Sequence, residues 1–193
     1  KKENSSEYIY QLERQIISIL LKYGAEEILF EDIILNKNEK GDIVESKKEI
    51  RSKVFEKIYL DLQQDEIEFT HGPFKEIYNK LINSLHNQNL VSIDSFINDL
   101  EPNSSKIVSD NLINDEKYQL HDWEKKNVYV KKIGSELSQL VNETILNMRR
   151  YLIDKKITEL QGNSKDDKDK VLEEVMSYYN LKKLLSAKLN RVV

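Results

Sequence analysis

Cysteine is absent from this chain of 193 residues, which excludes disulfides, thiolate catalysis and cysteine-ligated zinc. Glycine (5) and proline (2) are scarce, which disfavours a turn-rich β fold and favours helices. No apolar run approaches the roughly 18 residues of a membrane span, and no signal peptide is visible. The chain begins with Lys1 rather than Met, so we expect a fragment of a larger protein. The absence of cysteine is compatible with a cytoplasmic protein, which is the location we expect.

Charge is unevenly distributed along the chain. Residues 1–121 hold 15 Lys/Arg against 23 Asp/Glu, whereas residues 122–193 hold 15 against 11. An acidic body with a mildly basic tail argues against the whole chain lying on DNA. The cations near the C-terminus fit two interpretations: they complement a helix dipole, or they contact an acidic surface.

Helical periodicity dominates the first 121 residues. The spacing predicts a helix over 6–23 ended by Gly24, and a short helical piece at 26–30. Ser46 to Glu49 match a capping box, which predicts a helix behind it. That helix would carry Ile50, Val54, Ile58 and Leu62 at four-residue spacing. Further helices are expected from Gly72-Pro73, Ser92 and Pro102 onward. A polar loop is expected at 36–42.

The last seventy residues show a different pattern. From Asp122 the apolar positions indicate one very long helix, a break at Gly162-Asn163-Ser164 and a second helix running to Val193. Helices joined by so short a turn fold back on each other. We therefore expect an all-α fold. A compact multi-helix bundle over 6–121 would precede a long helix and a protruding C-terminal helical hairpin over 122–193.

The last helix carries more apolar residues than one partner helix can cover. An isolated hairpin would leave part of this apolar surface exposed to solvent, and such exposure usually marks a binding face. Apolar burial would supply affinity, and cations would add steering. The candidate partner-binding residues are Leu172, Val175, Met176, Tyr179, Lys182, Lys183, Leu184, Leu185, Leu189 and Arg191.

Two residues have a special position along the tail. Gly134 lies inside the long helix and fits either close helix packing or a hinge. Trp123, the single tryptophan, stands where bundle and long helix meet. It is predicted to anchor the hairpin to the bundle, with a binding role as the alternative.

The sequence offers no constellation for catalysis. His71, His86 and His121 follow no metal-ligand spacing, and the five glycines are scattered singly, without a phosphate-binding loop. Three acidic residues alternate with lysines and indicate the solvent-exposed start of a helix: Asp166, Asp167 and Asp169. We therefore predict no catalytic residue, metal or cofactor in this chain.

Several segments together resemble the C-terminal helicase-binding domain of bacterial primase, the DnaG family, in its Bacteroidetes-like form. The resembling segments are Glu13 to Gly24, Phe69 to Tyr78, Val91 to Ile97, Ile107 to Trp123 and Leu181 to Val193. Each motif is mostly apolar spacing, and their order and distances are more specific than any one of them. The polar loop at 36–42 is longer than that family leads us to expect.

The resemblance implies a non-catalytic module that docks a DNA primase onto the N-terminal domains of a DnaB-type hexameric helicase and modulates helicase activity. The fragment would be monomeric, work in the cytoplasm at the replication fork, contact no membrane and touch nucleic acid weakly or indirectly. Two alternatives remain: a nucleic-acid-binding helical module, suggested by the basic tail, and the N-terminal domain of a replicative helicase itself.

Overall fold

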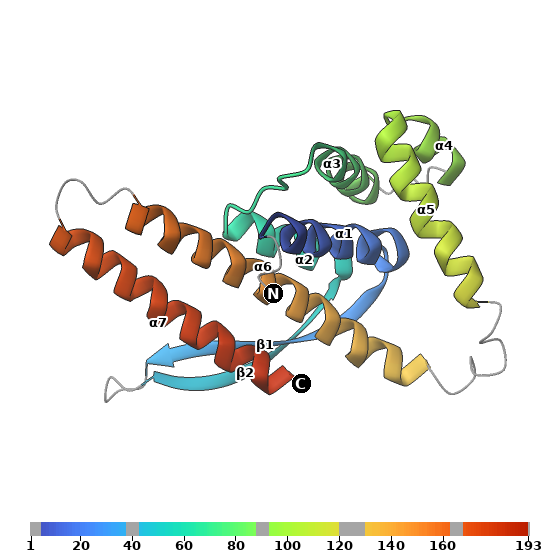
Figure 1. The fold of residues 1–193 in the computed structure, drawn as a ribbon. Coiled ribbons are helices and arrows are strands. Elements are labelled where there is room, and N and C mark those ends of the chain that lie inside the picture. Colours follow the sequence, from blue (N-terminus) through green and yellow to red (C-terminus); the bar gives the residue numbers. More distant parts are fainter. Residues whose placement is uncertain (1–4, 38–42, 88–92, 120–129, 163–167, 193) are drawn as a thin grey trace. The chain divides into compact units, whose positions relative to one another are not determined.

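The computed structural model describes residues 5–37, 43–87, 93–119, 130–162 and 168–192 (Figure 1). The fold is predominantly all-α, as predicted. Its elements run, in chain order, α1 (Ser5–Tyr23), β1 (Glu27–Lys37), β2 (Ile43–Lys53), α2 (Val54–Gln64), α3 (Gly72–His86), α4 (Ile93–Asn98), α5 (Pro102–Gln119), α6 (Val130–Gly162) and α7 (Lys168–Val192).

The chain divides into two compact units. One unit comprises residues 1–12 and 142–193, and the other comprises residues 13–141. Helices α1 and α6 each contribute residues to both units. The predicted boundary between residues 121 and 122 falls outside the described residues, so the division into 6–121 and 122–193 stays a prediction.

Helix α1 confirms the predicted first helix. Its apolar stripe is buried, with Ile16, Ile17 and Leu20 almost fully enclosed. Gly24 ends the helix, and its N–H donates to the Leu20 carbonyl at 3.0 Å. A Cβ at residue 24 would lie 2.4 Å from that oxygen, so the close approach requires glycine.

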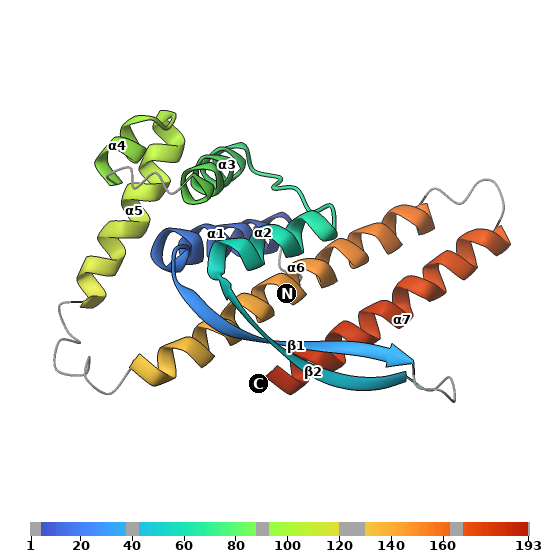
Figure 2. The same cartoon turned by 180° about the vertical axis from the view of Figure 1, so that it is seen from behind.

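The expected short helix at 26–30 and the expected helix start at Ser46 are both wrong. Both segments belong to a β-hairpin in which β1 pairs antiparallel with β2 (Figure 2). In this pairing Phe30 lies opposite Ile50. Ile28, Phe30 and Ile50 share one face of the hairpin, and Phe30 is fully buried. Strand periodicity therefore governs these apolar residues, and the four-residue spacing from Ile50 to Val54 spans the end of β2 and the start of α2. Residues 38–42 of the expected polar loop lie outside the described residues.

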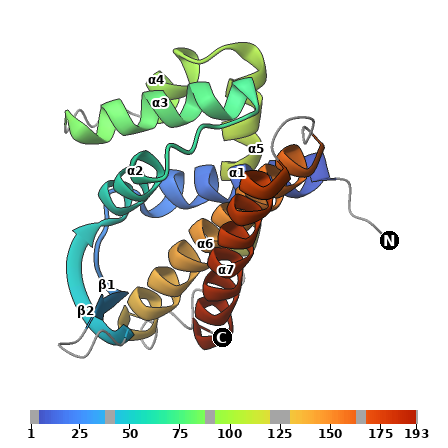
Figure 3. The same ribbon diagram turned by 90° about the vertical axis from the view of Figure 1, so that its left-hand side faces the viewer.

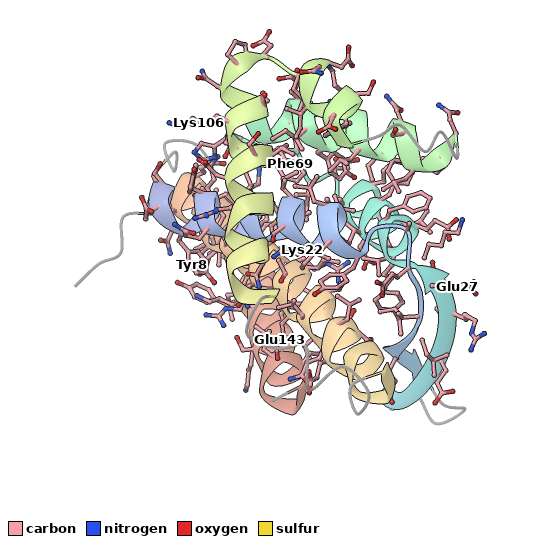
Figure 4. The ribbon with its side chains drawn as sticks, turned by 90° about the vertical axis from the view of Figure 1, so that its right-hand side faces the viewer. Tyr8, Lys22, Glu27, Phe69, Lys106 and Glu143 are labelled. Atoms are coloured by element: carbon pink, nitrogen blue, oxygen red, sulfur yellow. The ribbon has the colours of Figure 1, made fainter. Side chains whose placement is uncertain are left out.

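Contacts from distant parts of the sequence set the start of α2. The Val54 N–H donates to the Glu26 carbonyl at 2.9 Å, and the Phe55 N–H donates to the Gly24 carbonyl at 3.0 Å. The carboxylate of Glu56 also accepts from the Lys53 N–H at 3.3 Å. Figure 4 labels Glu27 at the start of β1, beside this junction. Tertiary hydrogen bonds thus replace the local capping box that the sequence suggested at Ser46.

The predicted start of α3 at Gly72-Pro73 is confirmed, and α1 supplies its cap. Glu13 on α1 is 0% exposed. Its Oε1 accepts from the Thr70 N–H at 2.6 Å and from the Thr70 hydroxyl at 2.7 Å. Its Oε2 accepts from the His71 N–H at 3.2 Å and lies 2.8 Å from His71 Nδ1. One buried carboxylate therefore satisfies the backbone amides that precede α3.

A second carboxylate caps α5 in the same way. Glu76 on α3 accepts from the Glu101 N–H at 3.1 Å and from the Ser104 hydroxyl at 2.5 Å. The predicted helix start at Pro102 is confirmed. Figure 3 shows α3, α4 and α5 following one another in this unit. A carboxylate on α1 thus caps α3, and a carboxylate on α3 caps α5.

Replacing Glu13 with glutamine should lower the free energy of unfolding by about 2–4 kcal/mol, because an amide NH2 would replace one carboxylate oxygen among the Thr70 N–H, Thr70 hydroxyl and His71 N–H donors. Urea unfolding of Glu13→Gln and of the wild type measures this change. The control is Glu7→Gln, an exposed position on the same helix where the Gln11 amide donates to the carboxylate. Equal stabilities for the two variants would contradict the capping role of Glu13.

Candidate functional site

The described part of the C-terminal tail forms the predicted helical hairpin. The second part of α6 and the whole of α7 lie side by side, and five residues separate the end of one from the start of the other (Figures 1 and 2). Between them is a buried cluster of Leu146, Ile153 and Ile157 from α6 and Val175, Leu185 and Leu189 from α7. Leu160, Val171 and Tyr178 pack against this cluster. The short connection makes the two helices antiparallel.

The hairpin core divides the predicted partner-binding residues into two groups. Val175, Leu185 and Leu189 are buried and pack against α6. The other apolar candidates remain exposed: Leu172 59%, Met176 58%, Tyr179 50% and Leu184 49%. Leu181, which was not among the candidates, is 44% exposed as well. α7 therefore uses one side for the hairpin core and leaves another apolar side uncovered.

Leu172, Met176, Tyr179 and Lys183 form one stripe, which we name the outer face of α7. They follow each other at intervals of four, three and four residues, so they stack on one side of the helix. Lys183 is exposed and places a cation at the end of the apolar run. Leu184 adjoins this stripe, and Leu181 lies further round the helix.

The predicted cations differ in their surroundings. The Lys182 ammonium forms an ion pair with Asp154 on α6, with 32% of the lysine side chain and 47% of the aspartate side chain exposed. Such a half-exposed pair contributes on the order of 0–1 kcal/mol to the contact between α7 and α6. Lys183 faces solvent. The side chain of Arg191 lies outside the described residues.

The start of the chain also contributes to this unit. Ile9 and Leu12 of α1 are buried. The ring of Tyr8, which Figure 4 labels, lies 6.1 Å from the ring of Tyr151 at an interplanar angle of 47°, and this contact joins α1 to α6. The hairpin core is therefore supported from the other side of α6, whereas nothing described covers the outer face of α7.

Two predicted roles stay predictions. Gly134 lies within α6, where the helix is continuous, and both close packing and a hinge remain open. Trp123 lies outside the described residues, so its predicted anchoring role has no structural counterpart here.

Sequence reasoning missed the two capping carboxylates. Glu13 and Glu76 stand on helices as ordinary polar positions, and their partners Thr70 and Ser104 are 57 and 28 residues away in the sequence. The only available signal was the position of Glu13 beside the buried Leu12 and Ile16, where a charged residue is rare unless it is paired.

The contacts of Glu76 also set its charge state. Burial raises the pKa of Glu76, but hydrogen bonds from the Ser104 hydroxyl, the Glu101 N–H and Lys80 outweigh it, so the net pKa lies below the ordinary glutamate value. The Lys80 ammonium lies 3.3 Å from Glu76 Oε1 and 3.2 Å from Asp99 Oδ2. Lys80 thus joins α3 to the end of α4 between two carboxylates.

A shallow pocket of about 420 Å³ lies beside this ion-pair network. It is lined by Lys80, Asn83, Ser84, Asn87, Ser95, Phe96 and Asp99. The lysine is already bound to two carboxylates, so the pocket presents no net cation to an anionic ligand. Among the described residues, no group of three or more His, Asp or Glu side chains could hold a metal ion. No described helix is long and apolar enough to cross a membrane.

A family model described as "Domain of unknown function (DUF8430)" matches residues 1–192, which is nearly the whole chain. No curated protein and no solved structure matches the chain significantly.

The neighbours Leu184 and Leu185 give a matched pair for testing the two sides of α7. Leu185→Ala should lower the free energy of unfolding by about 2–4 kcal/mol, because it leaves a cavity in the hairpin core. Leu184→Ala should change it by no more than about 0.5 kcal/mol, because the side chain is half exposed. Thermal or urea unfolding measures both, and equal losses would contradict this assignment of buried and exposed residues.

The lowered pKa of Glu76 predicts that the free energy of unfolding decreases at acidic pH. A carboxyl whose pKa is lower in the folded state stabilises the fold above its unfolded-state pKa of about 4.3, and this contribution is lost as the pH falls through the lower folded value. The stability difference between wild type and Glu76→Gln should therefore be largest near neutral pH and shrink in acid. Urea unfolding at a series of pH values measures it, with the exposed Glu173→Gln as control. A difference that is independent of pH would contradict the prediction.

Proposed function

The chain belongs to the DUF8430 family, and on that premise we propose that it is a non-catalytic protein-interaction module that binds its partner through the outer face of α7. The observation that carries this proposal is the exposure of Leu172, Met176 and Tyr179 in one stripe of a helix that packs on α6 through another side. Large apolar side chains scattered singly on a surface need no explanation, whereas a stripe of them on one helix suits a docking surface.

The stripe has the dimensions of a helix-in-groove contact. Its members lie at spacings of four and three residues, the pattern by which an amphipathic helix presents anchors to another protein. Burying each side chain fully would contribute roughly 1.5–3 kcal/mol before the cost of association is subtracted. Three such anchors supply a moderate affinity, and the aromatic Tyr179 is the residue type most often found as an energetic hot spot.

The charges along α7 would orient the partner. Glu173 and Glu174 are exposed near the start of the stripe, and Lys183 is exposed at its end. A partner surface that is basic opposite the first half and acidic opposite the second half would dock in one direction only. Charges at such a rim change the association rate and the register more than the affinity.

For the partner, we propose the N-terminal domains of a DnaB-type replicative helicase. The support is the resemblance of five ordered segments to the helicase-binding domain of primase. This chain would then be the docking part of a DNA primase, an enzyme that synthesises RNA primers, and would work in the cytoplasm at the replication fork and modulate the helicase. It would itself carry no catalytic residue.

Binding of the full chain to the purified helicase N-terminal domain of the source organism tests the proposal by calorimetric titration. Met176→Ala should weaken binding by about tenfold or more, because it removes a central anchor. The matched control is Leu181→Ala, which truncates another exposed apolar residue of α7 outside the stripe. Both variants should keep the melting temperature of the wild type.

Three results would contradict the proposal. Binding that survives deletion of 164–193 would exclude the hairpin as the docking element. Equal effects of Met176→Ala and Leu181→Ala would exclude the outer face. Absence of binding by the wild type would exclude the helicase, and the same variants could then be tested against other partners.

Nucleic acid is a second candidate partner, because the C-terminal part of the chain is basic. Lys155 and Lys156 are exposed on α6, and residues 122–193 carry a net positive charge. Binding to single-stranded DNA would weaken steeply as salt rises and would be insensitive to Met176→Ala. Retention of single-stranded DNA at low salt, lost in Lys155→Ala/Lys156→Ala, would favour this alternative.

A further inference from the structure

The outer face of α7 has a residue spacing that is the same in both directions along the helix. Leu172, Met176, Tyr179 and Lys183 follow at intervals of four, three and four residues, so the stripe is symmetric about a point between residues 177 and 178. When a second α7 is turned end over end and the two midpoints coincide, Met176 lies level with Tyr179 of the second copy. In the same register Leu172 lies level with Lys183. Any other antiparallel register leaves at least two members of the stripe without a member of the second copy beside them.

A second helix can pack on the outer face while α6 stays in place. The residues of α7 in the hairpin core are Val175, Leu185 and Leu189. With roughly 100° of rotation per residue, the centre of the outer face lies roughly 110° around the helix from the centre of these three residues. Helices of a bundle contact two neighbours on two such sides, so α7 can contact α6 and a second α7 at the same time.

The charges at the two ends of the outer face favour the antiparallel direction. Glu173 is exposed beside Leu172 at one end, and Lys183 is exposed at the other end. In the antiparallel pair, the aliphatic stem of Lys183 can cover Leu172 of the second copy while its ammonium reaches Glu173 of that copy. Symmetry forms this pair of opposite charges twice. A parallel pair would instead place Lys183 beside Lys183 and Glu173 beside Glu173, which is repulsive.

We propose that two copies of this chain associate through the outer faces of their α7 helices, antiparallel, in the register that places Met176 level with Tyr179 of the second copy. Two layers of Met176 against Tyr179 form the middle of the contact, and Leu172 under Lys183 closes each end. The three apolar side chains that each copy contributes are 50–59% exposed in the single chain. Spacing and charge complementarity together select a reversed second copy as the occupant of this face.

The dimer would also regulate docking, and this consequence rests on the proposed function. A partner and a second copy use the same stripe, so binding of one displaces the other. Self-association would keep the apolar stripe out of water until a partner competes for it.

Sedimentation equilibrium of the full chain at low salt, over a series of concentrations and without any partner, tests the self-association. The wild type should move from the chain mass of 22.8 kDa towards twice that mass as the concentration rises. Met176→Asp should abolish the dimer, because it places a charge in the middle of the contact. The matched control is Leu181→Asp, which changes an exposed apolar residue of α7 outside the stripe and should dimerise like the wild type. Both variants should keep the helical circular dichroism signal of the wild type.

Exchanging the charges at positions 173 and 183 tests the direction and the register. Lys183→Glu alone and Glu173→Lys alone should each raise the dissociation constant of the dimer by roughly tenfold, because each replaces two attractive pairs with two repulsive ones. An equimolar mixture of the two variants should recover the wild-type affinity, since both ends of the mixed pair again bring opposite charges together. The double variant Glu173→Lys/Lys183→Glu should recover it as well. Raised salt should reduce these differences.

Three outcomes would overturn the self-association. The first is a wild type that stays monomeric at high micromolar concentration, as the sequence resemblance leads us to expect. The second is a dimer that persists in Met176→Asp. The third is a mixture of the two charge variants that dimerises no better than either variant alone. None of these experiments contains the helicase domain, so their failure leaves the docking proposal intact, and a failure of helicase binding leaves the dimer intact.

The regulation has its own measurement. The titration with the helicase N-terminal domain is repeated at a chain concentration above the dissociation constant of the dimer. The apparent affinity should be lower there than at a concentration where the chain is monomeric, because part of the binding energy is spent on separating the dimer. Equal apparent affinities at the two concentrations would contradict the competition.

Discussion

The buried carboxylate of Glu13 is the constraint on which the unit of residues 13–141 depends. A charge without solvent is costly unless donors surround it, and the backbone amides before α3 are donors without a local partner. Placing the two together satisfies both. Glu76 on α3 repeats the arrangement at the start of α5. The positions of α3 and α5 are therefore set by hydrogen bonds as well as by apolar packing, and hydrogen bonds specify direction where apolar contacts do not.

In the C-terminal hairpin, α7 has more apolar surface than α6 can cover. Val175, Leu185 and Leu189 close the hairpin core, and the Asp154–Lys182 ion pair joins the two helices. Once these contacts are made, Leu172, Met176 and Tyr179 lie on another side and remain in water. An exposed stripe on a helix that is already stably packed presents pre-ordered anchors, so little ordering cost remains when a partner binds.

In the β-hairpin, local sequence patterns predicted helices where the chain forms strands. Ser46 to Glu49 have the composition of a capping box, and Ile50, Val54, Ile58 and Leu62 have helical spacing. Only the last three belong to a helix, because Ile50 pairs with Phe30 across the hairpin and α2 begins at Val54. A capping motif is local, whereas the pairing of β1 with β2 brings together residues up to 26 positions apart, from Glu27 to Lys53. Tertiary pairing overrode the local signal.

The sequence by itself determined the helical class, the starts of α3 and α5 at Gly72-Pro73 and Pro102, the end of α1 at Gly24 and the set of apolar residues in α7. These features depend on local periodicity and on the backbone restrictions of glycine and proline, which act within a few residues. Tertiary structure alone decided that residues 27–53 form a hairpin, that Glu13 and Glu76 cap distant helices, and which side of α7 is buried. Each of these outcomes depends on which groups meet in space, and a carboxylate or a leucine has the same local pattern whether a partner reaches it or not.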